Sequence, residues 1–125
     1  MRALILVGMG GCIGAIARYL VAGWVQQLSN TAWFPFGTLT VNIVGCFVIG
    51  MAGGASENMN LLTPSTRLFA LIGILGSFTT FSTFGYETLM LVRDGEALAA
   101  LTNVGLHTIL GLCAAWVGFA LASLV

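Results

Sequence analysis

The sequence predicts an all-α membrane protein with four transmembrane helices in a single integral membrane domain, residues 1–125. Of the 125 residues, 58% are hydrophobic and only 6% are charged, which is more apolar than a water-soluble domain of this size requires. A membrane-spanning helix needs roughly 20 apolar residues. Four such stretches fill nearly the whole chain, and we expect spans at about 3–28, 36–54, 68–92 and 97–125.

Charge and cysteine content exclude several functions. The net charge is zero and no lysine is present, so the sequence indicates neither nucleic-acid binding nor a lysine-containing phosphate loop. Cys12, Cys46 and Cys113 all lie in apolar stretches, where we expect them to pack rather than to form disulfides. The only histidine lies in a different predicted span from the central hydroxyl residues. No nucleophile–base pair is indicated, and we expect no enzymatic activity.

The first predicted span carries small residues and one charged residue. Gly10 and Gly14 are four residues apart, a spacing that favours close contact between helices. Arg18 follows Gly14 by one turn on the same face. Two interpretations fit this arginine. It either reaches the headgroups or backbone carbonyls for structural reasons, or it lines a wet vestibule and attracts anions.

The second predicted span has one slim side and one amide. Gly45, Gly50 and Gly54 keep that side small, and Asn42 is its only strongly polar side chain. An amide in hydrocarbon must find hydrogen-bond partners. Asn42 therefore either bonds to a neighbouring helix or donates its NH₂ group to a passing anion.

The third predicted span starts after Thr63, which is expected to cap a helix with Pro64 at its first position. Its centre, residues 76–85, is rich in hydroxyl side chains and has a glycine at each end. Such residues weaken a helix, and exposed backbone at membrane depth needs cover from protein or water. We expect a helix broken mid-membrane that offers an ion site. A kinked helix at a packed interface is the alternative.

Three phenylalanines recur at every third residue of this centre: Phe78, Phe81 and Phe84. The edge of a phenyl ring is positive and can contact an anion without holding it tightly. Ser82 and Thr83 add hydroxyl donors beside the rings. This composition favours an anion path, whereas an aromatic packing ladder would explain the rings alone.

Polar residues near the last two spans have open roles. Glu87 lies one turn beyond Thr83, either at the membrane interface or at a pore mouth. Asn103 and His107 are four apart and share a helix face. His107 either packs with a hydrogen bond or relays protons. As the only histidine, it offers no multi-histidine metal site.

The arginines give almost no orientation signal. Arg2 and Arg67 are expected on one side of the membrane and Arg93 on the other. The positive-inside rule therefore sets little bias, and copies could insert both ways. An antiparallel homodimer would then be allowed.

Three motifs stand out in the first three spans: 11–15 (GCIGA) with Arg18 and Tyr19, 37–45 (GTLTVNIVG), and 76–84 (GSFTTFSTF). Together they closely resemble the Fluc/CrcB family of bacterial fluoride channels. The resemblance covers nearly the whole chain, and the TTFSTF string is its most specific part. It implies an antiparallel dual-topology homodimer in the bacterial inner membrane. Such a dimer has two pores that release fluoride passively.

The resemblance also implies site residues. The pore positions map to Phe81, Phe84, Asn42, Ser82 and Thr83. A structural sodium ion would be held at the dimer centre by backbone carbonyls that map to Gly76 and Thr79, each contributed twice.

Two departures from the family pattern concern Ser77 and the fourth span. Ser77 stands where relatives often have glycine. A pore hydroxyl is expected one turn beyond the histidine of the fourth span, where this sequence has Gly111 and Ala115.

Two other functions are weaker fits. A small multidrug-type exporter needs an acidic residue in the membrane, whereas the first span offers Arg18, and Glu87 is the only acid near a span. A non-transporting scaffold subunit explains the glycine faces but not the hydroxyl and phenyl run.

Overall fold

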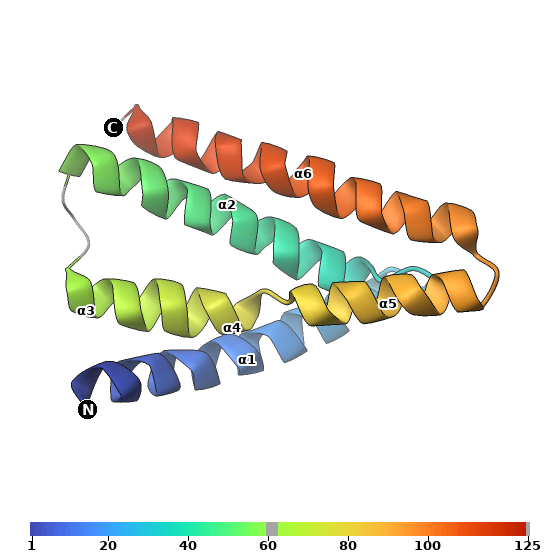
Figure 1. Cartoon of the computed structure of the whole chain (residues 1–125), viewed down its shortest axis with the longest axis horizontal. Helices are drawn as coiled ribbons and strands as arrows, with labels where there is room; N and C mark the ends of the chain where they lie inside the picture. The colour runs from blue at the N-terminus through green and yellow to red at the C-terminus, as the bar shows by residue number, and fades with distance from the viewer. Residues whose placement is uncertain (60–62, 125) are drawn as a thin grey trace.

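The structure, a computed structural model, describes residues 1–59 and 63–124, so the predicted end of the fourth span at 125 lies outside it. The described chain is helical: α1 (Arg2–Leu28), α2 (Phe36–Met59), α3 (Pro64–Thr66), a π-helix η1 (Arg67–Leu75), α4 (Gly76–Phe78), α5 (Phe81–Arg93) and α6 (Ala97–Ser123). The two ends of the chain lie at the same end of the bundle (Figure 1).

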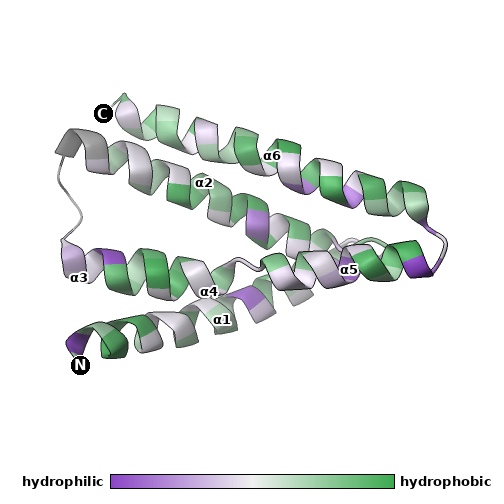
Figure 2. Cartoon of the chain, in the orientation of Figure 1, coloured by the Kyte–Doolittle hydropathy of each residue, from purple (hydrophilic) through white to green (hydrophobic). Residues whose placement is uncertain are grey.

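Four helical segments of the described chain are long and apolar enough to cross a membrane: Arg2–Leu28, Phe36–Ser56, Pro64–Arg93 and Ala97–Ser123. Figure 2 shows that hydrophilic positions are few and scattered along these helices. The prediction of an all-α protein with four apolar spans is confirmed, and the chain is a multi-pass membrane protein.

Helix α1 packs against η1 and α4 through glycines. A Cβ atom at Gly14 would overlap the backbone carbonyl of Ile74, and one at Gly10 would overlap the carbonyl of Phe69. The opposing residue of η1 is itself a glycine, Gly73, which lies against Gly10. The close contact predicted from the Gly10–Gly14 spacing is therefore confirmed.

Helices α2 and α6 form the other close pair and lie side by side along most of their length (Figure 1). A Cβ atom at Gly50 would overlap the carbonyl of Ala115, and one at Gly118 would overlap the carbonyl of Phe47. Of the slim side predicted for the second span, Gly50 and Gly54 face α6, whereas Gly45 faces Thr79 of the third segment. Lipid tails are as apolar as the helix surfaces, so the hydrophobic effect does not drive helices together in a membrane. Close van der Waals packing of the backbones stabilises this pair instead.

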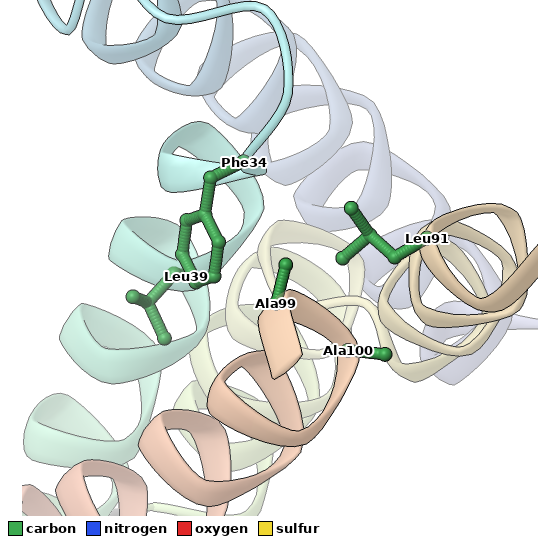
Figure 3. Close-up of a cluster of buried hydrophobic side chains, with 5 residues drawn as sticks. All are labelled: Phe34, Leu39, Leu91, Ala99 and Ala100. Carbon is green, nitrogen blue, oxygen red and sulfur yellow. The ribbon is translucent and has the colours of Figure 1, made fainter. Parts of the chain in front are cut away.

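An apolar cluster closes the bundle at the end opposite the termini. Its members come from the α1–α2 link, α2, α5 and α6: Phe34, Leu39, Leu91, Ala99 and Ala100 (Figure 3). Because the last three flank the α5–α6 turn, the cluster fixes that turn against the start of α2.

Gln26 holds the α1–α2 link in place beside this cluster. Its Nε2 group donates to the carbonyls of Thr31 (2.6 Å) and Phe34 (3.0 Å), and its Oε1 accepts from the Gly37 N–H (3.1 Å). The first turn of α2 is thereby anchored to the end of α1.

The third segment starts as predicted and then departs from a regular helix. The Thr63 hydroxyl accepts from the Thr66 N–H, and Pro64 occupies the first helical position. The helix then widens into η1, with the Gly76 N–H reaching the carbonyl of Leu71 five residues back. This π-helix, a form often found at functional sites, was not predicted from the sequence.

Glycine packing leads to a stability prediction. We expect Gly14→Ala to lower the stability of the fold by about 1–3 kcal/mol, because the added methyl group must push α1 away from η1. Gly8→Ala is the matched control on the same helix, since no atom lies within 4 Å of its Cβ position. The measurement is the thermal unfolding midpoint of both variants in detergent. Equal midpoints would contradict the close contact.

Candidate functional site

The helical backbone of the third segment is interrupted at Thr79 and Thr80. Thr79 has ψ 156°, and Thr80 has φ −151° and ψ 113°, so both residues are extended. Figure 1 shows the resulting gap between α4 and α5. The phenylalanine spacing does not follow one helix, because Phe78 ends α4 whereas Phe81 starts α5.

Asn42 of α2 pairs with the backbone at this interruption. Its Nδ2 group donates to the Thr80 carbonyl at 3.1 Å, and its Oδ1 accepts from the Thr80 N–H at 2.8 Å. The interhelical hydrogen bond considered for Asn42 is therefore present. It uses one of the two Nδ2 hydrogens.

Thr80 caps the start of α5. Its buried Oγ1 accepts from the Thr83 N–H (3.2 Å) and donates to the Thr83 hydroxyl (2.9 Å), and it lies 3.3 Å from the Ser82 hydroxyl. Thr80 was not predicted from the sequence as a site residue. The feature that could have indicated it is the residue type, because threonine is a preferred N-cap residue at the start of a helix.

These two arrangements release two backbone carbonyls. In a continuous α-helix, the N–H groups of Thr80 and Thr83 would bind the carbonyls of Gly76 and Thr79. Here they bind Asn42 and the Thr80 hydroxyl instead. The carbonyls of Gly76 and Thr79 therefore lack the N–H donors that a continuous helix would give them.

A cavity of about 560 Å³ lies between α2, the third segment and α6. It is bordered by five of the predicted site residues: Asn42, Gly76, Thr79, Phe81 and Phe84. The rings of the two phenylalanines are 5.5 Å apart, and Phe81 is 83% exposed in the single chain.

A larger cavity of about 1040 Å³ lies between α1, α2 and α5. Arg18, Thr83 and Glu87 line it, and Thr80 borders both cavities. Ser82 lines neither of them.

The charged groups of this larger cavity are only partly paired. Glu87 Oε1 accepts a hydrogen bond from the Thr38 hydroxyl at 2.7 Å. Within the described residues, Glu87 Oε2 and Arg18 Nε are buried without a partner. Thr38 was not singled out from the sequence, because 49 residues separate it from Glu87.

Helix α6 completes the smaller cavity with His107. Its Nδ1 lies 3.0 Å from the carbonyl of Asn103, and since a carbonyl only accepts, Nδ1 carries the hydrogen. The ring contacts Phe84, with centroids 4.4 Å apart. Of the two roles considered for His107, this arrangement agrees with a packed side chain that makes a hydrogen bond. Gly111, Ala115 and Thr108 also line the cavity, and the Thr108 hydroxyl donates to its own helix.

Comparisons with known proteins agree along nearly the whole chain. A family model described as CrcB-like protein, Camphor Resistance (CrcB), matches residues 5–119. A protein of Geotalea daltonii named Fluoride-specific ion channel FluC is 43% identical over 122 residues, 98% of each chain. Proteins of the same name from Geobacter sulfurreducens and Nitratidesulfovibrio vulgaris are 44% and 41% identical, over 94% and 100% of each chain.

Proposed function

The chain belongs to the CrcB-like family, and we propose that it is a fluoride-selective ion channel that exports fluoride passively. The observation that carries this proposal is the 43% identity to a named fluoride channel over 98% of both chains. Hydrogen fluoride is a weak acid that crosses lipid in neutral form and dissociates inside the cell. A channel lets the membrane potential expel the trapped anion without any enzymatic step.

The fluoride path runs past Phe81 and Phe84, with Asn42, Ser82 and Thr83 as its polar groups. Support comes from the smaller cavity, which both phenyl rings and the amide border. Ring edges and hydroxyl donors replace water without binding the ion tightly, as conduction requires. The second Nδ2 hydrogen of Asn42 adds a donor.

The larger cavity serves as a vestibule to this path. Arg18 and Glu87 line it, and Thr80 connects it to the smaller cavity. The guanidinium group raises the local concentration of anions. Glu87, bonded to Thr38, shapes the wall beside the hydroxyl groups.

A structural sodium ion is held by the carbonyls of Gly76 and Thr79, each contributed by two subunits. The fit is supported by the loss of helical donors at both carbonyls. Oxygen ligands of this kind suit a hard cation. The bound charge would lower the cost of bringing anions into a low-dielectric protein.

The functional unit is an antiparallel, dual-topology homodimer in the bacterial inner membrane. In the single chain, Gly76, Phe81 and Ser82 are exposed around the helix interruption, near the middle of the Pro64–Arg93 segment. Lipid cannot satisfy broken backbone at mid-membrane depth, so this region must be covered by protein or line a water-filled cavity. A second copy provides such a protein surface, and the weak arginine asymmetry allows both orientations.

The test is ion efflux from liposomes that contain the purified protein. We expect rapid fluoride efflux, read with a fluoride electrode, and chloride efflux close to that of protein-free liposomes. Liposomes that leak neither ion, or leak both equally, would overturn the proposed function.

Removal of sodium is expected to weaken the assembly. Protein purified with a large organic cation in place of sodium should show less dimer by chemical crosslinking and a lower thermal midpoint, because four carbonyl oxygens would face one another without a cation. Restoring sodium should reverse both changes. Identical behaviour with and without sodium would contradict the metal site.

A further inference from the structure

Helices α5 and α6 share one buried polar contact. Asn103 has 0% exposed surface, and its Nδ2 group donates to the Thr88 hydroxyl at 2.9 Å. That hydroxyl donates in turn to the carbonyl of Phe84 at 2.8 Å. A hydroxyl has one hydrogen, so its lone pairs face the amide. The contact therefore joins Asn103 to the backbone of Phe84 in a fixed direction.

This contact occupies a specific place in the antiparallel α5–α6 hairpin. Leu91 and Ala100 belong to the apolar cluster near the turn. About one turn further along each helix, Thr88 meets Asn103. One more turn away, the Phe84 ring contacts His107 of α6. The two helices diverge with distance from the turn that connects them (Figure 1). The polar contact thus separates the closed end of the hairpin from the 560 Å³ cavity.

The apolar contacts of the hairpin cannot set this geometry alone. Apolar contacts are non-directional, so the cluster at the turn tolerates rotation of α5 about its axis. A hydrogen bond loses strength steeply as its angle departs from linear. The Asn103–Thr88 bond on the α6 side, together with the Thr38–Glu87 bond on the α2 side, therefore restrains the rotation of α5 and with it the position of Phe84.

A contribution to fold stability does not explain why an asparagine occupies position 103. Within the described residues, Asn103 Oδ1 is buried without a hydrogen-bond partner. Leaving a buried acceptor unpaired is unfavourable, and replacing both partners of a buried hydrogen bond by apolar groups of the same shape can be nearly neutral. Leucine has the same branching as asparagine and would avoid the unpaired oxygen.

We propose that Asn103 is a positioning residue for Phe84, acting through Thr88 to orient the ring at the wall of the fluoride path. The inference rests on the proposed function. Asn103 does not line the cavity itself and acts only through the helix that it holds.

The experiment compares fluoride efflux and thermal stability in reconstituted protein. Asn103→Leu and Thr88→Val should each lower the efflux rate about fivefold, the population change that one ordinary hydrogen bond supports. The thermal midpoint of Asn103→Leu should stay unchanged or rise. Thr88→Ser keeps the hydroxyl and should keep the wild-type rate. Thr102→Val, which removes an exposed hydroxyl next to Asn103, is the control and should also conduct normally.

A double variant tests the shared route. Because both changes remove the same bond, Asn103→Leu combined with Thr88→Val should conduct as slowly as either single variant and no slower. Wild-type rates in both single variants, independent losses that multiply, or efflux that falls only as stability falls would overturn the proposal. If Asn103→Leu does not assemble, the Thr88→Val and Thr88→Ser pair decides. Absent efflux in the unsubstituted protein would instead overturn the proposed function.

Discussion

Replacing Phe84 with isoleucine is expected to lower fluoride efflux about tenfold or more, because one aromatic contact contributes about 1 kcal/mol and the path depends on several. The ring lies against both Phe81 and His107, at centroid distances of 5.5 and 4.4 Å. Isoleucine keeps the apolar bulk but has no polarised ring edge. Efflux is measured in liposomes at equal protein content.

The same experiment on two other phenylalanines sharpens this result. Phe81→Ile should behave as Phe84→Ile does, since both rings border the same cavity. Phe119→Ile is the control, because this residue packs beside Gly53 on α2, away from the helix interruption. Dimer content by crosslinking should not change in any variant. Undiminished efflux in both cavity variants would return the rings to a packing role.

The fold was predictable where the cause is local or repeats along the chain. Four apolar stretches predict four spans, because burial in lipid depends on composition alone. The Thr63–Pro64 start was predictable because a cap bonds within its own first turn. The π-helix η1 was not predictable in this way. Its wide turns place Gly73 against Gly10 of α1, a contact between residues far apart in the sequence.

The site was predictable in composition but not in its pairings. Hydroxyl and glycine residues predicted an irregular third span, and the structure has two extended residues there. What holds them extended is a side chain 38 residues away, Asn42, and no spacing rule indicates that pairing. The hydrogen bond between Thr38 and Glu87 could not be predicted either, because these residues are 49 positions apart in the sequence. The roles assigned to the pore and sodium residues stay predictions.

Asn42→Asp should have the largest effect of all, with fluoride efflux close to that of protein-free liposomes. The aspartate has nearly the same shape but only acceptor atoms, so an oxygen replaces the donor 3.1 Å from the Thr80 carbonyl. The amide donor offered to the anion is lost at the same time. A carboxylate there repels fluoride in a medium of low dielectric constant, where charge interactions are strong.

Asn42→Leu separates the effect of the added negative charge from the effect of losing the amide group. Leucine adds no charge, but it leaves the Thr80 N–H and carbonyl without their partners and should cost about 1–3 kcal/mol of stability for each unpaired group. Slower efflux in Asn42→Asp than in Asn42→Leu, measured at equal dimer content, would assign the difference to charge on the path. Equal rates would mean that the added negative charge has no effect of its own. Full efflux in Asn42→Asp would remove Asn42 from the ion path, because fluoride could not pass a fixed negative charge unhindered.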